Sequence, residues 1–150
     1  MRVLVIDDEP DILLLCRVNL GFAGHEVLEA PDGERGMELA MRDRPDLIVL
    51  DVMLPTLDGL SVLRMLREHP ETSETPVILL TARAQFDDQA RGWEAGCAEY
   101  VTKPFSPTDL ADVIARAREM TPQDRRLRRD QALADLARGV ELLSPGRISR

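Results

Sequence analysis

The chain has 150 residues, of which 44% are hydrophobic and 31% are charged, and its formal net charge is −8. This length and composition predict one globular domain, exclude an intrinsically disordered chain, and contain no apolar run near the ~18 residues that a membrane-spanning helix needs. The negative charge disfavours binding to nucleic acid, and the first ten residues show no secretory leader, so we expect a cytoplasmic protein with no membrane contact.

Short apolar, β-branched runs alternate with longer segments of helical spacing through residues 1–120. The last helical segment carries apolar side chains at i, i+3, i+4 and i+7 from Leu110 to Ala117. Five strands alternating with five helices predict an α/β fold, in which a doubly wound parallel sheet carries helices on both faces. The predicted strands are Val3–Ile6, Val27–Leu28, Leu47–Leu50, Val77–Leu80 and Tyr100–Val101.

Prolines mark three predicted helix starts. Pro10 suits the first turn of a helix that follows the acidic run after the first strand. Ser106-Pro107 combines an N-cap residue with a first-turn proline. Thr121-Pro122 repeats that pattern and predicts one more helix after residue 120, with a stop at Ser144-Pro145-Gly146.

One edge of the predicted sheet collects reactive side chains. In an open parallel sheet, functional groups gather at the carboxyl ends of the strands. Asp7 and Asp8 follow the first strand, Asp51 the third and Thr81 the fourth, while Lys103 follows the fifth. Each residue alone is an ordinary cap, loop or surface residue. Their joint occurrence at strand ends predicts three carboxylates, a hydroxyl and an ammonium in one site.

This set of groups suits phosphoryl chemistry. Three adjacent carboxylates repel one another unless a cation joins them, and hard oxygen ligands suit Mg²⁺. A cation there would leave one carboxylate oxygen available as a nucleophile. The oxygens of a phosphoryl group arriving on Asp51 need positive charge and donors, which Mg²⁺, Lys103 and Thr81 could supply. Lys103 is also the only lysine beside 18 arginines, which favours a position that a planar guanidinium does not fit.

With these motifs, residues 1–120 resemble the receiver domain of bacterial two-component response regulators. The resemblance implies a flavodoxin-like sheet of strand order 2-1-3-4-5 with five flanking helices, to which residues 121–150 add a helical tail without a complete output domain. It implies that Asp51 is the phosphoacceptor, with Lys103 and Thr81 acting beside it. No residue of the family's core pattern is missing.

The same resemblance implies a set of metal ligands. Asp8, Asp51 and the backbone carbonyl of Met53 would bind Mg²⁺ directly, and Asp7 would act through a water molecule. Mn²⁺ would be able to substitute for Mg²⁺.

Further residues take roles in switching by the same comparison. Thr81 and Tyr100 resemble the hydroxyl and the aromatic side chain that move inward on phosphorylation. Ala82 resembles the small residue that leaves room for the phosphoryl group. The peptide bond between Lys103 and Pro104 resembles a conserved cis bond, which X-Pro sequences adopt at a cost of only about 0.5–1 kcal/mol.

The implied reaction is Mg²⁺-dependent transfer of a phosphoryl group from a sensor histidine kinase or a phosphotransfer protein. The chain would catalyse only this transfer and its own slow dephosphorylation, and it would not be an enzyme acting on other substrates. The signal would pass by population shift between two conformers to a downstream protein target. The surface that changes would comprise the fourth helix, the fifth strand and the fifth helix.

Two positions near the phosphoacceptor bear on how long the phosphoryl group survives. Met53 lies two residues after Asp51, and Arg83 lies two residues after Thr81. Both are expected to flank the path of the hydrolytic water, and neither is a good general base at neutral pH. We expect a phosphoryl lifetime of minutes or longer.

The tail after residue 120 leaves three alternatives open. Residues 1–120 carry 12 basic and 23 acidic side chains, whereas residues 121–150 carry 7 and 4. Leu133, Leu136, Val140 and Leu143 form an a/d-like seam of only about two heptads. The tail helix could pack on its own receiver, or it could mediate a homodimer or another protein contact. It could also link this receiver to an output domain, for example a DNA-binding one, in a longer regulator. The surface of the fourth helix, fifth strand and fifth helix is a second possible homodimer contact.

Other functional classes fit the sequence less well. Aspartyl phosphatases typically place a second Asp two residues after the nucleophile, where this chain has Met53. Nucleotide-binding folds and flavodoxins need a phosphate-binding loop after the first strand, and Asp7-Asp8-Glu9-Pro10 would repel a phosphate there. A degenerate receiver would lack a site residue, and none is missing.

Overall fold

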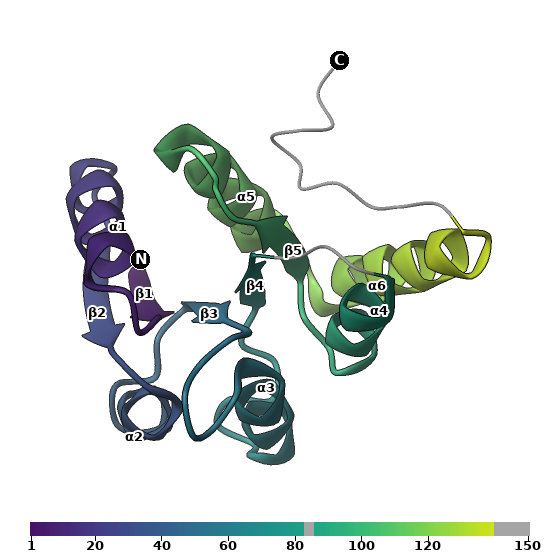
Figure 1. The fold of residues 1–150 in the computed structure, drawn as a ribbon, viewed down its shortest axis with the longest axis horizontal. Helices are drawn as coiled ribbons and strands as arrows, with labels where there is room; N and C mark the ends of the chain where they lie inside the picture. The colour runs from purple at the N-terminus through teal and green to yellow at the C-terminus, as the bar shows by residue number, and fades with distance from the viewer. Residues whose placement is uncertain (83–85, 140–150) are drawn as a thin grey trace.

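The computed structural model describes residues 1–82 and 86–139, which form one five-stranded parallel sheet with helices on both faces (Figure 1). The strand order is β2-β1-β3-β4-β5, as the sequence predicts. The strands are β1 (Arg2–Ile6), β2 (Glu26–Ala30), β3 (Leu47–Asp51), β4 (Val77–Thr81) and β5 (Glu99–Thr102). The helices are α1 (Pro10–Phe22), α2 (Gly33–Asp43), α3 (Gly59–Glu68), α4 (Phe86–Glu94), α5 (Pro107–Glu119) and α6 (Pro122–Ala137).

Alternate side chains of each central strand enter two separate hydrophobic cores. On one face, Leu4, Ile48 and Leu79 pack with apolar residues of α2, α3 and α4. On the other face, residues such as Val5 and Val49 pack with α1 and α5. Every residue of β3 and β4 is buried, which explains why these strands are almost continuously apolar in sequence.

The predicted helix starts are confirmed. Pro10 opens α1. Ser106 caps α5 by accepting a hydrogen bond from the Asp109 N–H, and the Asp109 carboxylate in turn accepts one from the Ser106 N–H. Thr121 and Asp124 form the same reciprocal capping box at α6.

The predicted end of the tail helix is wrong. Helix α6 ends at Ala137, well before the predicted stop at Ser144-Pro145-Gly146. The Arg138 N–H closes the last turn on Ala134 and Asp135, and Gly139 then takes φ +79°, a left-handed conformation that suits glycine after a helix. Val140, Leu143 and Arg83 lie outside the described residues.

Helix α6 packs against α4 of the same chain (Figure 1). Ala132 is fully buried in the core that α3 and α4 share, and Leu133 and Leu136 pack against that core. Among the three alternatives for the tail, this arrangement is the one in which the helix packs on its own receiver. Among the helices described, none is long and apolar enough to cross a membrane.

Arg128 joins α6 to two other elements, α4 and the start of β5. The Arg128 guanidinium lies 4.8 Å from the ring centroid of Trp93 on α4, which is a cation–π arrangement. Its Nη2 lies 3.2 Å from Oε1 of Glu99, the first residue of β5. The side chain of Glu99 is only 13% exposed, so this ion pair is largely shielded from water.

Candidate functional site

Three carboxylates meet at the carboxyl ends of β1 and β3. The two strands are neighbours in the sheet, and Asp7 directly follows β1 while Asp51 is the last residue of β3. One carboxylate oxygen each of Asp7, Asp8 and Asp51 lies within 4.8 Å of the others. Asp7 and Asp51 are buried, and Asp8 is exposed. The fold therefore brings together the acidic residues that the sequence places at strand ends.

Backbone N–H groups hold two of these carboxylates in place. The Glu9 N–H donates to Asp7 Oδ1 at 2.9 Å, and the Met53 N–H donates to Asp51 Oδ1 at 3.0 Å. Burial raises the pKa of Asp7 above its ordinary value, against the opposing effects of the Glu9 N–H and Lys103. The inner oxygen of Asp7, Oδ2, receives no hydrogen bond of good geometry from the described residues, and the cation that lies beside it is the Lys103 ammonium.

Lys103 joins the acidic cluster from the loop after β5. Its Nζ lies 2.9 Å from Asp7 Oδ2, 3.2 Å from Asp51 Oδ2 and 3.0 Å from Glu9 Oε1. Burial by itself would lower the pKa of Lys103, but the three carboxylates outweigh it and raise the pKa well above the ordinary range. The Lys103–Pro104 peptide bond is cis.

Glu9 is a site residue to which the sequence reasoning gave no role. Its side chain is 57% exposed and reaches Lys103 at the rim of the cluster. The signal available was the run of three consecutive acids after the first strand. A third acid at this position also stabilises the amino end of α1 through the helix dipole. This ordinary explanation accounts for Glu9 without any contact to Lys103.

The two residues for which the sequence predicts a switching role, Thr81 and Tyr100, lie on the neighbouring strands β4 and β5. Thr81 is 3% exposed and pairs in register with Thr102, and the Lys103 N–H donates to the Thr81 carbonyl at 2.6 Å. Tyr100 is 5% exposed and packs on α4 at Gly92, where an added Cβ would lie 3.0 Å from Cε2 of the tyrosine ring. The Tyr100 ring is therefore in packing contact with α4.

The remaining predicted residues surround the cluster less tightly. Ala82 follows Thr81 and is exposed. The Met53 side chain is 70% exposed. Because its N–H bonds Asp51, the contact of Met53 with the cluster is through its backbone.

Gly59 sets how closely α3 approaches the end of β3. A Cβ added there would lie 2.2 Å from the Asp51 carbonyl oxygen and 2.8 Å from the Val52 Cα. The Gly59 N–H also donates to the Val52 carbonyl at 3.0 Å. Only glycine fits this approach, because any other residue would place its Cβ against the backbone of Asp51 and Val52.

The arrangement can hold a divalent cation. Its oxygen donors are hard, partly hydrated at Asp8 and close enough to share one ion. One oxygen of Asp51 is held by a backbone N–H and the other lies beside the Lys103 ammonium, so the orientation of this carboxylate is fixed.

Comparisons with known proteins agree on one family. The model of the response regulator receiver domain matches residues 3–115. The chain is 40% identical over 148 residues to the DNA-binding dual master transcriptional regulator RpaA of Synechocystis, covering 99% of this chain and 58% of that protein. It is 37% identical over 150 residues to the response regulator MprA of Mycobacterium leprae, covering 100% of this chain and 62% of that protein. The chain thus spans little more than half the length of these relatives.

Solved structures give the same result. A putative response regulator from Chloroflexus aurantiacus superposes with a TM-score of 0.75 at 31% identity, covering 79% of this chain and 98% of the other. The chemotaxis protein CheY4 of Vibrio cholerae superposes with a TM-score of 0.75 at 29% identity, covering 77% and 97%. Both superpositions cover nearly all of the other chain and leave about a fifth of this one unmatched.

Proposed function

This chain belongs to the receiver-domain family of two-component response regulators, and we propose that Asp51 is the residue on which it accepts the phosphoryl group. The observation that carries the proposal is the position of Lys103. Its ammonium bridges Asp51 and Asp7 inside a buried acidic cluster, at the strand ends where a phosphoryl group on Asp51 would need positive charge.

We propose Mg²⁺ as the divalent cation of this cluster. Asp8, Asp51 and the Met53 carbonyl would bind it, with Asp7 acting through water and Mn²⁺ able to substitute. The support is the set of three carboxylates with mutually close oxygens, which suits a hard, partly hydrated ion. When bound, Mg²⁺ would offset the negative charge of the cluster and of the incoming phosphoryl oxygens.

The proposed transfer uses Asp51 as an oxygen nucleophile. A carboxylate oxygen forms a bond to the phosphorus of a phosphohistidine, and the phosphorus–nitrogen bond breaks with its electron pair going to the imidazole. Lys103 and the Thr81 hydroxyl would donate to the phosphoryl oxygens, and Ala82 leaves them space. The donor would be a sensor histidine kinase or a phosphotransfer protein, and the chain would turn over no substrate of its own.

The proposed output is a shift between conformers that involves α4. Thr81 would move toward the phosphoryl group and Tyr100 would follow, and Tyr100 packs directly on α4 at Gly92. Because α6 packs on α4, the signal would reach residues 121–150 as well as the surface formed by α4, β5 and α5. Either surface could contact a downstream protein or a second copy of the chain.

A second candidate function is that of a receiver domain within a longer response regulator. The curated relatives are longer regulators, and RpaA is described as DNA-binding. Residues 1–120 would then be the receiver domain of such a regulator, and residues 121–150 the start of its connection to an output domain.

Phosphorylation by a small phosphodonor tests the central proposal. Wild-type protein incubated with Mg²⁺ and acetyl phosphate should gain the mass of one phosphoryl group, and Asp51→Asn should gain none. Asp112→Asn, an exposed aspartate on α5 without a described contact, is the matched control and should behave as wild type. Labelling of Asp51→Asn, or no labelling of wild type, would overturn the assignment.

The lifetime of the phosphoryl group is a separate proposal. Met53 offers no general base, and Arg83, which lies outside the described residues, is not one either at neutral pH. The half-life of the phosphorylated protein should be minutes or longer. A half-life of a few seconds without added phosphatase would contradict this.

A further inference from the structure

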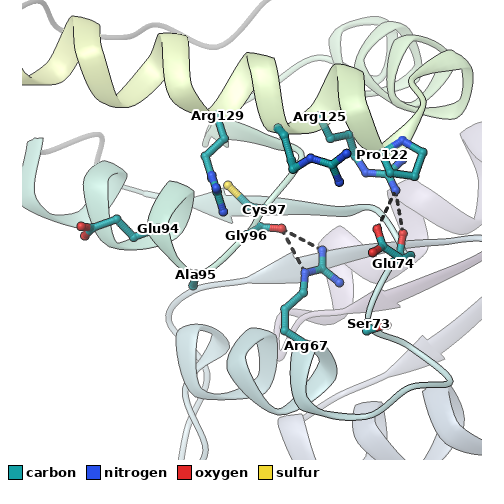
Figure 2. Close-up of a pocket in the computed structure, with 11 residues that line it drawn as sticks. Arg67, Ser73, Glu74, Glu94, Ala95, Gly96, Cys97, Pro122, Arg125 and Arg129 are labelled. Carbon is teal, nitrogen blue, oxygen red and sulfur yellow. Dashed lines mark hydrogen bonds and ion pairs between the residues drawn. The ribbon is translucent and has the colours of Figure 1, made fainter.

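A cleft of about 310 Å³ opens at the amino-terminal edge of the sheet, away from Asp51. Its walls come from the end of α3, the loop before β4, the loop between α4 and β5, and the first turns of α6 (Figure 2). Because the strands are parallel, the loops that precede β4 and β5 lie at the end opposite to the acidic cluster. This volume is at the low end of the roughly 300–1,000 Å³ typical of small-molecule sites.

Positive charge converges on this cleft although the whole chain is acidic. Four guanidinium groups line it against two carboxylates, in a protein whose net charge is −8. Arg67 rises from α3 on one side while Arg125 and Arg129 project from α6 on the other, and Glu94 points away from them (Figure 2). The arginines are Arg67, Arg125, Arg126 and Arg129.

Arg67 is half-buried without a carboxylate partner among the described residues. Its Nε and Nη2 donate to the Gly96 carbonyl at 3.2 and 2.8 Å, and its Nη1 donates to the Thr72 carbonyl at 3.2 Å. These neutral acceptors fix the plane of the guanidinium but do not balance its charge. Burial and, to a smaller degree, the nearby Arg125 lower its pKa, which reflects how poorly that charge is compensated.

The arginines of α6 are also only weakly paired. Arg125 donates to the Glu74 carbonyl at 2.9 Å, and its ion pair with the exposed Glu74 carboxylate is long, at 3.6 Å. Arg126 is exposed and makes no hydrogen bond or ion pair with a described residue. The buried Nε of Arg129 lacks a hydrogen-bond partner, and the carboxylate of Asp130 lies 3.8 Å away.

We propose that this cleft binds a small phosphate-bearing anion. Planar guanidinium forks match the oxygens of a phosphate group and bind it through charge-assisted hydrogen bonds. The excess of two positive charges in the lining matches a dianion, and the concave shape favours a small molecule. An anion held between Arg67 and the α6 arginines would also fasten α6 to the receiver, so that ligand binding and α6 docking stabilise each other.

Calorimetric titration with inorganic pyrophosphate tests the site. The buffer should contain EDTA and have constant ionic strength, so that metal-dependent binding at Asp51 does not contribute to the measured heat. Pyrophosphate should bind saturably with one site per chain, and Asp51→Asn should bind equally. Arg126→Gln and Arg129→Gln should each bind about tenfold more weakly, the effect of losing one charge-assisted contact. The Arg126 variant breaks no described contact, so it should fold normally.

Matched controls separate a built site from general charge. Arg118→Gln removes an exposed arginine on α5, outside the cleft, and should bind pyrophosphate like wild type. Succinate, a dicarboxylate, should bind more weakly than pyrophosphate. The absence of saturable binding, equal weakening by Arg118→Gln and Arg126→Gln, or succinate binding as tightly as pyrophosphate would each overturn the proposal. None of these outcomes depends on whether Asp51 is the phosphoacceptor.

Discussion

Replacing Arg128 with methionine tests how strongly α6 is held on the receiver. The substitution keeps an apolar side chain of similar length but removes the guanidinium that contacts both Trp93 and Glu99. The cation–π contact contributes about 0.5–2 kcal/mol, and leaving a buried carboxylate without its partner costs about 1–3 kcal/mol. Because one guanidinium serves both contacts, the two effects overlap, and we expect the free energy of unfolding to fall by about 2–3 kcal/mol.

The loss caused by Arg128→Met should depend on pH. Burial raises the pKa of Glu99 in the folded protein, and Arg128 opposes that rise. A carboxylate whose folded-state pKa is raised costs stability when charged, and this cost is relieved as the pH falls through the folded-state pKa. Without Arg128 the pKa of Glu99 rises further. The difference between variant and wild type should therefore shrink from neutral pH to about pH 5.

Urea denaturation followed by tryptophan fluorescence measures both effects, since Trp93 is the only tryptophan. Adding Glu99→Gln to Arg128→Met should recover part of the lost stability at neutral pH, because no buried charge is then left unpaired. Arg118→Met, on the exposed face of α5, is the control and should stay within about 0.5 kcal/mol of wild type. A loss from Arg128→Met that is equally small, or one that neither pH nor Glu99→Gln changes, would refute the reasoning.

Three further predictions concern single substitutions, and the first has a second glycine as its comparison. Gly59→Ala should destabilise the fold by about 3 kcal/mol in thermal melts, because the added Cβ would overlap the Asp51 carbonyl. Gly21→Ala should stabilise α1 by about 0.5 kcal/mol, because a Cβ at that position meets nothing within 4 Å. Equal effects of the two substitutions would contradict the packing argument. Lys103→Gln should tighten Mg²⁺ binding about tenfold or more by calorimetry, because the ammonium competes for the same carboxylates; unchanged or weaker binding would count against the site. Ala132→Asp should remove hydrogen-exchange protection from α6 but not from the sheet, and full protection would contradict docking through this fully buried residue.

The sheet and its active edge were accessible from the sequence because local patterns determine them. The run from Leu47 to Leu50 has to be buried on both faces, which only the interior of a sheet provides. Once the strands are parallel, Asp7, Asp51 and Thr81 must lie at the same edge. Sequence order alone then brings the acidic residues together, as the structure bears out.

The position of α6 was not accessible in the same way. Ala132 is fully buried, yet an alanine in a charged helix gives no periodic signal of burial. Arg128 lies 35 positions after Trp93 and 29 after Glu99, and no local pattern encodes pairings at such separations. The a/d-like seam that includes Leu133 and Leu136 predicted that the helix continues past residue 140. The helix instead ends at Ala137, where Gly139 takes a left-handed conformation, and the sequence reasoning gave no weight to this single glycine.

The acidic cluster and the arginine cleft place local charges of opposite sign at the two ends of the strands. One end carries Asp7, Asp8 and Asp51, and the other carries the arginines of α6 and Arg67. A charged partner approaching at low ionic strength would feel a torque before contact and would meet one end preferentially, an effect that fades beyond about 8 Å at physiological salt. The rate and orientation of encounter with a partner would then be set partly by charges that never enter the final interface.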